Sequence, residues 1–266
     1  MKKRLSVLLL VCSGAAVLVR LLQQFLGFEA GTGLPVHSLL FALPLIALAL
    51  VWLAASRAVP SSDAPVIPRD FTLSKNMLFL PVAGVFLLLL SGIAWLFFGL
   101  MPQTSEAIAA DGTLISVVTT GPVSFRTMVL LGILNLILGL SLLPLVAACR
   151  PEGPKKPFQP ALALAAPVVL VVRLVLIYRV HSVNPVISAY AVELLAMICL
   201  TLAFYRLAGF GCGVGNSRRF VLFAGWAVML SLATLADGHS IPDVLFYLGA
   251  PLVLLGLLLR RLEPAA

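Results

Sequence analysis

Eight apolar segments follow one another along this chain, and each is long enough to span the roughly 30 Å hydrocarbon core of a bilayer. A soluble domain could not bury them all, because 61% of the 266 residues are hydrophobic and only 11% are charged. The sequence therefore predicts an all-α fold, a polytopic integral membrane bundle of eight transmembrane helices. The segments occupy residues 5–26, 34–55, 77–101, 127–149, 160–180, 186–208, 220–236 and 244–260.

Basic residues concentrate in alternate breaks between these segments. Lysine and arginine close to membrane helices are preferentially retained in the cytoplasm. On an eight-helix path, both termini and the breaks at 56–76, 150–159 and 206–219 lie on one side, and they hold most of the 18 lysines and arginines. The opposite breaks are acidic and carry Glu29, Glu106, Asp111, Asp237 and Asp243, with Arg126 at a helix edge. We therefore expect a cell (plasma) membrane protein with both termini cytoplasmic.

Short motifs recur in the same order in the two halves of the chain. The matched pairs are Val19-Arg20-Leu21 with Val172-Arg173-Leu174, Pro35-Val36-His37-Ser38 with Pro185-Val186-Ile187-Ser188, Ala83-Gly84 with Ala224-Gly225, and Leu131-Gly132 with Leu248-Gly249. This order predicts one membrane domain, 1–266, built as a tandem four-plus-four repeat of halves 1–150 and 157–262, with a cytoplasmic linker at 150–159. The alternative is eight unrelated helices, because apolar segments match easily by chance.

Arg173 and Glu193 lie inside the hairpin formed by the fifth and sixth segments, each ten residues from Val183 in the break between them. On antiparallel helices the two charges fall at nearly the same depth, roughly 10 Å below the surface at about 1.5 Å rise per residue. Ionisable residues within a membrane are costly and mark functional sites by default. We therefore expect Arg173 and Glu193 to form an ion pair.

Three further residues belong to the same candidate ligand-binding set: Arg20, Asn135 and Tyr190. Arg20 and Asn135 fall in the same depth layer, and Tyr190 shares a helical face with Glu193. Two arginines beside one carboxylate would leave excess positive charge, which suits an anionic group held in bidentate fashion.

Each of these residues also has a structural interpretation. Arg173 and Glu193 fit a structural bridge, and Arg20 fits a side chain that extends to the membrane interface. Asn135 lies between Gly132 and Gly139 and fits an interhelical hydrogen bond on a close-packed face. Tyr190 fits an aromatic residue at the interface.

Two function classes remain. One is a transport or binding protein for a small anionic or lipid-linked solute. The other is a non-catalytic membrane subunit or assembly factor that binds a membrane protein partner and whose Arg-Glu pair is structural. We expect no enzyme activity, because the sequence holds no recognisable motif of an intramembrane protease. We also expect no cofactor, no metal site and no nucleic-acid partner, since the net charge of +8 follows from the loop asymmetry and the three histidines lack ligand spacing.

Overall fold

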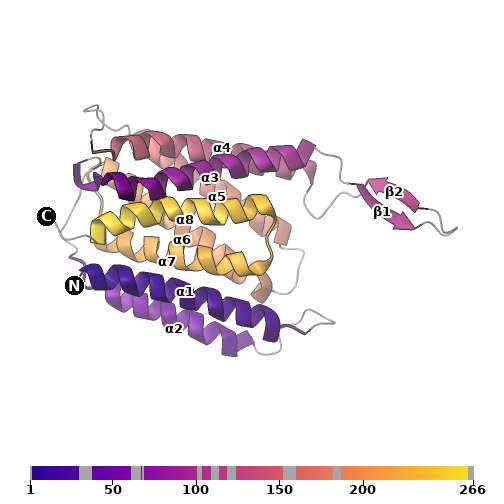
Figure 1. Ribbon diagram of the computed structural model, residues 1–266, viewed down its shortest axis with the longest axis horizontal. Helices are drawn as coiled ribbons and strands as arrows, with labels where there is room; N and C mark the ends of the chain where they lie inside the picture. The colour runs from indigo at the N-terminus through magenta and orange to yellow at the C-terminus, as the bar shows by residue number, and fades with distance from the viewer. Residues whose placement is uncertain are drawn as a thin grey trace.

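The computed structural model places long helices side by side along most of the chain (Figure 1). It describes residues 2–29, 38–60, 67, 69–100, 104–108, 114–118, 124–151, 160–181 and 187–262. The long helices are α1 (Lys2–Leu26), α2 (Ser38–Ser56), α3 (Lys75–Leu100), α4 (Phe125–Ala148), α5 (Pro160–His181), α6 (Ile187–Gly211), α7 (Ser217–Thr234) and α8 (Ile241–Leu262). Two short 3-10 helices, η1 (Arg69–Phe71) and η2 (Leu235–Asp237), and two strands, β1 (Thr104–Ile108) and β2 (Leu114–Val118), complete the described elements.

The predicted helical membrane bundle is confirmed. Seven of the described helices are long and apolar enough to cross a bilayer, and α2 contributes a shorter apolar stretch, Ala42–Ser56. Large apolar side chains cover the outside of the bundle; among the most exposed are Phe25, Phe79, Phe86, Leu100 and Val175. Such a surface would drive aggregation in water. In lipid it is the expected outer face, so the bilayer is the environment of this protein.

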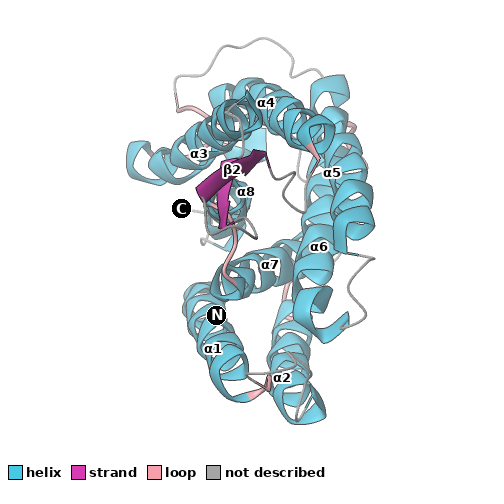
Figure 2. Cartoon of the chain, turned by 90° about the vertical axis from the view of Figure 1, so that its right-hand side faces the viewer, coloured by secondary structure: helices cyan, strands magenta, loops and turns pink. Residues whose placement is uncertain are grey.

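Six helices form a closed ring in which sequence neighbours are also neighbours in space, from α3 through α8, and α8 packs back on α3 (Figure 2). Helices α1 and α2 pack on the outside of this ring, against α7. The start of α1 and the end of α8 lie at the same end of the bundle, which we call the terminal end. The strands β1 and β2 project from the other end, the hairpin end.

The two predicted halves pack differently. Helix α6 packs on α7, the next helix of its own half. Its counterpart in the proposed repeat, α2, packs on α1 and on α7, which belongs to the other half. The tandem repeat stays a prediction. Residues 152–159 of the expected linker lie outside the described part of the chain.

Glycines allow α3 and α4 to approach closely, as the spacing of Gly132 and Gly139 predicts. A Cβ added at Gly132 would lie 3.0 Å from the carbonyl oxygen of Gly92 on α3, and a Cβ at Gly92 would lie 3.0 Å from the carbonyl oxygen of Gly132. At Gly139 an added Cβ would lie 2.7 Å from the side chain of Leu89. Small residues at such positions let helix backbones pack closely in membranes.

The connection between α3 and α4, which the sequence analysis counted among the acidic breaks, contains a small antiparallel hairpin. Strand β1 pairs with β2 in a register that sets Thr104 opposite Val118 and Ile108 opposite Leu114. Strands of five residues give a much weaker sequence signal than a membrane helix, which explains why the hairpin was missed.

Candidate functional site: a buried polar layer near the hairpin end

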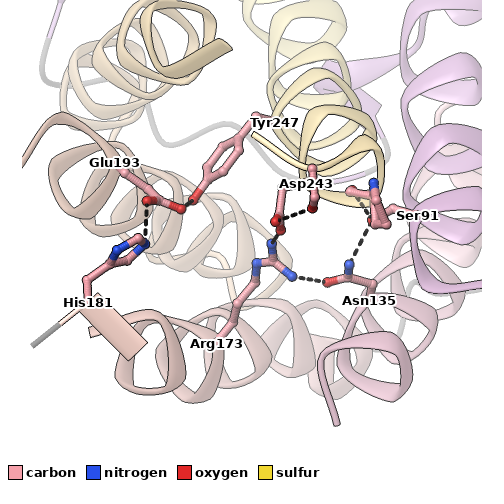
Figure 3. Close-up of polar contacts among 9 residues, drawn as sticks. Ser91, Asn135, Arg173, His181, Glu193, Asp243 and Tyr247 are labelled. Atoms are coloured by element: carbon pink, nitrogen blue, oxygen red, sulfur yellow. Dashed lines mark hydrogen bonds and ion pairs between the residues drawn. The ribbon is translucent and has the colours of Figure 1, made fainter. Parts of the chain in front are cut away.

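Arg173 lies on α5 with its side chain fully buried inside the ring (Figure 3). Its Nη2 donates to Oδ1 of Asp243 at 2.7 Å, and its Nη1 donates to Oδ1 of Asn135 at 2.8 Å. The guanidinium carbon lies 3.8 Å from the centre of the Phe246 ring, which adds a cation–π contact. Arg173 therefore has a charged partner, a neutral hydrogen-bond acceptor and an aromatic face.

The network continues from Asn135 across α3 and returns to α8. The Asn135 amide donates to the Ser91 hydroxyl at 2.8 Å, and that hydroxyl donates to the carbonyl oxygen of Pro242 at 2.6 Å. Asp243 also accepts from the Ser240 hydroxyl at 2.7 Å and lies in the first turn of α8, where the helix dipole favours a carboxylate. Asn135 thus makes the expected interhelical hydrogen bonds, which join α3, α4 and α5.

Glu193 on α6 belongs to a second cluster. His181, the last residue of α5, places its Nε2 3.0 Å from Oε2 of Glu193. The Tyr247 hydroxyl donates to Oε1 at 2.8 Å. Tyr190 stacks on the His181 ring, with a centroid separation of 5.2 Å and nearly parallel planes, so it positions the imidazole.

The predicted ion pair between Arg173 and Glu193 is wrong. Arg173 binds Asp243, and Glu193 binds His181 and Tyr247. Equal depth fixes the height of a side chain in the membrane but not its direction around the helix axis. Asp243 and Tyr247 lie four residues apart, on one face of α8, and α8 therefore receives both groups from the α5–α6 hairpin.

Arg20 is part of a third cluster, between α1 and η2. Its Nε forms an ion pair with Oδ1 of Asp237, and its Nη1 donates to Oε1 of Gln23 at 2.7 Å. Gln24 donates to the same Asp237 oxygen at 2.8 Å. The side chain of Arg20 is fully buried, so its expected extension to the membrane interface is wrong. The reason is that Arg20 faces the α7–α8 connection, which supplies a carboxylate partner.

The structure divides the candidate residues into groups. Asn135 and Arg173 touch directly, and Tyr190 joins Glu193 through His181. Arg20 lies on α1, a helix outside the ring, and forms its ion pair with Asp237 of the α7–α8 connection.

The three clusters together hold two arginines and three carboxylates. Arg20 is matched by Asp237, and Arg173 is matched by Asp243. Among the described residues, Glu193 is left without an arginine. The expected excess of positive charge, which favoured an anionic ligand, is therefore replaced by one carboxylate beyond the number of arginines.

The sequence interpretation missed four partners: Asp237, Asp243, His181 and Tyr247. The two aspartates were assigned to a break outside the membrane segments, and His181 was considered only as a metal ligand, for which the histidine spacing is unsuitable. One available signal was the four-residue spacing of Asp243 and Tyr247, which puts two polar groups on one face of an otherwise apolar helix.

Comparison with known proteins gives no relative: no family model, no curated protein and no solved structure matches this chain. The functional interpretation therefore depends on the residues themselves.

Proposed function

We propose that this chain is a transport or binding protein of the plasma membrane and that Glu193 is the group that receives its solute. The observation that carries the proposal is the surroundings of Glu193. Its side chain is only 6% exposed, and its partners His181 and Tyr247 carry no permanent charge. Ionisable side chains inside membrane proteins mark solute, ion and proton pathways. The proposed role is binding and transport without catalysis.

The charge balance favours a cationic solute group over the anionic or lipid-linked solute that the sequence suggested. An anionic group would need an arginine to grip it, and Arg20 and Arg173 are each engaged by an aspartate. A small organic cation would instead neutralise the charge of Glu193. A proton is the smallest cation that can do so.

The positions of two histidines support access of a solute to Glu193 from the hairpin end. The His181 side chain is 36% exposed, so it connects Glu193 with the surface. His239 packs against the ring of Tyr247, with centroids 5.1 Å apart, and its buried Nε2 has no hydrogen-bond partner in the described structure. Polar groups thus continue from the surface of this end to the carboxylate.

The proposed orientation places the terminal end in the cytoplasm. Helix ends there carry Arg57, Arg150, Arg218 and Arg219, as expected for segments retained on the cytoplasmic side. Glu193 and His181 would then open toward the outside of the cell.

The proposal predicts that Glu193→Gln abolishes stabilisation of the protein by a cationic probe. Thermal unfolding of the detergent-purified protein is measured with choline, putrescine and agmatine as cations, and with glutamate and inorganic phosphate as anions. At least one cation should raise the unfolding midpoint of wild type, and Glu193→Gln should weaken its apparent affinity at least tenfold, because the amide lacks the charge that attracts it. A tenfold loss corresponds to about 1.4 kcal/mol.

Glu29→Gln is the matched control, because Glu29 is an exposed carboxylate at the same end of the bundle. It should bind the cation as wild type does. Stabilisation that follows the anions, or that survives Glu193→Gln, would contradict the proposed site.

A second candidate is a non-catalytic subunit or assembly factor that binds a membrane protein partner. Two observations favour it: Arg20 pairs with Asp237 in the α7–α8 connection and Arg173 pairs with Asp243 in the first turn of α8, and the β1–β2 hairpin projects beyond the helices. Each described strand has one neighbour, so each offers an edge for strand addition. Replacing residues 104–118 with a Gly-Ser linker should then release a partner from the native complex, seen as a smaller species on a native gel, with an unchanged unfolding midpoint.

A further inference from the structure

A cavity of about 350 Å³ opens at the terminal end of the bundle between α2 and α7. This volume falls within the range of about 300–1,000 Å³ that is usual for small-ligand sites. Arg57 at the end of α2 and Arg218 and Arg219 at the start of α7 line it, together with Leu53 and Leu222. The cavity therefore combines cationic groups with an apolar wall.

Reciprocal hydrogen bonds hold the two walls of this cavity together. The Trp52 indole on α2 donates to the carbonyl oxygen of Leu222 on α7 at 3.2 Å, and the Trp226 indole on α7 donates to the carbonyl oxygen of Ala49 on α2 at 3.0 Å. A Cβ at Gly225 would lie 2.0 Å from Nε1 of Trp52, so this glycine makes room for the indole. The spacing between α2 and α7 is thus fixed before any ligand arrives.

The three arginines of the cavity differ from the arginines in the polar layer. None of their guanidinium groups has an acidic partner among the described residues. Retention of positive charge in the cytoplasm explains why arginines are frequent at this end. It does not explain why Arg57 and the Arg218-Arg219 pair, which are far apart in sequence, meet at one cavity whose described lining residues include no carboxylate. Convergent cations without an acidic partner among the described residues favour an anionic ligand.

We propose that this cavity binds a phosphate group, supplied either by the headgroup of an anionic phospholipid or by a soluble phosphate. Guanidinium groups bind phosphate oxygens in bidentate fashion. The positive end of the α7 dipole adds to the attraction, because α7 begins at Ser217 beside the two arginines. Leu53 and Leu222 provide the apolar surface that the glycerol and first methylenes of a lipid would contact.

The test compares lipid retention by wild type and by the triple variant Arg57→Gln/Arg218→Gln/Arg219→Gln. Native mass spectrometry of the delipidated, detergent-purified protein is recorded with phosphatidylglycerol or phosphatidylcholine. Wild type should retain phosphatidylglycerol in preference to phosphatidylcholine, and the triple variant should lose at least tenfold of that preference. Arg150→Gln, an exposed arginine at the same end but outside the cavity, is the control and should behave as wild type.

A second measurement separates the two sources of phosphate. Inorganic phosphate at millimolar concentration is titrated into the delipidated protein by calorimetry. Saturable phosphate binding that the triple variant lacks, without a preference for phosphatidylglycerol, identifies a soluble phosphate as the ligand. Equal retention of both lipids by wild type together with no phosphate binding overturns the proposal. An equal loss in Arg150→Gln overturns it as well, because the effect would then be general surface charge.

The single variants Arg57→Gln and Arg219→Gln guard against misfolding of the triple variant, since both side chains are exposed. Each should weaken phosphatidylglycerol retention or phosphate binding about threefold while the unfolding midpoint stays unchanged. Wild-type binding in both single variants would contradict the proposed site.

Discussion

Replacing Asp243 with alanine is expected to destabilise the bundle by about 3–5 kcal/mol, because it leaves a buried guanidinium without its counter-charge. The Arg173 side chain is fully buried inside the ring. The remaining hydrogen bond to Asn135 and the contact with Phe246 do not neutralise the charge. We expect a lower yield of folded protein and a lower unfolding midpoint, measured by fluorescence-detected size-exclusion chromatography after heating.

A double variant separates loss of the pair from loss of one partner. Replacing a buried ion pair by apolar residues of similar volume is often neutral, whereas removal of one partner is costly. Arg173→Met/Asp243→Leu should therefore recover most of the midpoint lost in Asp243→Ala. Ser240→Ala serves as the control, because its exposed hydroxyl binds the other oxygen of the same carboxylate, and it should change stability by less than about 0.5 kcal/mol. A wild-type midpoint in Asp243→Ala would show that the ion pair does not hold α5 to α8.

The helices could be predicted because the length of an apolar segment in a membrane protein is set by the thickness of the bilayer. The fifth segment was expected at 160–180, and α5 runs from Pro160 to His181. The eighth was expected at 244–260, and α8 runs from Ile241 to Leu262. The expected segment therefore began three residues too late and left out Asp243. In the sequence Asp243 resembles a solvated loop residue, whereas in the structure it is the partner of Arg173.

The sequence predicted which residues belong to the candidate site but not which of them contact one another. Arg173 and Glu193 stand out because charges are rare within apolar segments, and the structure does bury both side chains. Their partners depend on how far each helix is rotated about its axis and on which helices are neighbours. Neither quantity follows from the apolar periodicity of helices that are hydrophobic on every face, such as α5 and α6. The position of α8 opposite the α5–α6 hairpin therefore required the structure.

Gly84→Ala is expected to cost at least about 3 kcal/mol, the upper part of the range for overpacking, because backbone atoms stand where the new methyl group would go. A Cβ at Gly84 on α3 would lie 2.6 Å from the carbonyl oxygen of Gly249 on α8, and a Cβ at Gly249 would lie 2.8 Å from the carbonyl oxygen of Gly84. A flexible side chain could turn away from such a contact, but a helix backbone cannot. The two helices must therefore separate.

Separation of α3 from α8 would also reach the polar layer, because this contact closes the ring of six helices and carries the hydrogen bond from Ser91 to Pro242. Gly14→Ala is the matched control: it makes the same change inside a helix, at a position where an added Cβ meets nothing within 4 Å. That variant should be neutral or more stable by about 0.5–1 kcal/mol, since alanine loses less conformational entropy in a helix. Unfolding midpoints of both variants, measured in the same detergent, decide the matter. Equal midpoints for Gly84→Ala and Gly14→Ala would mean that α3 and α8 are not in close contact and that the ring is open on that side.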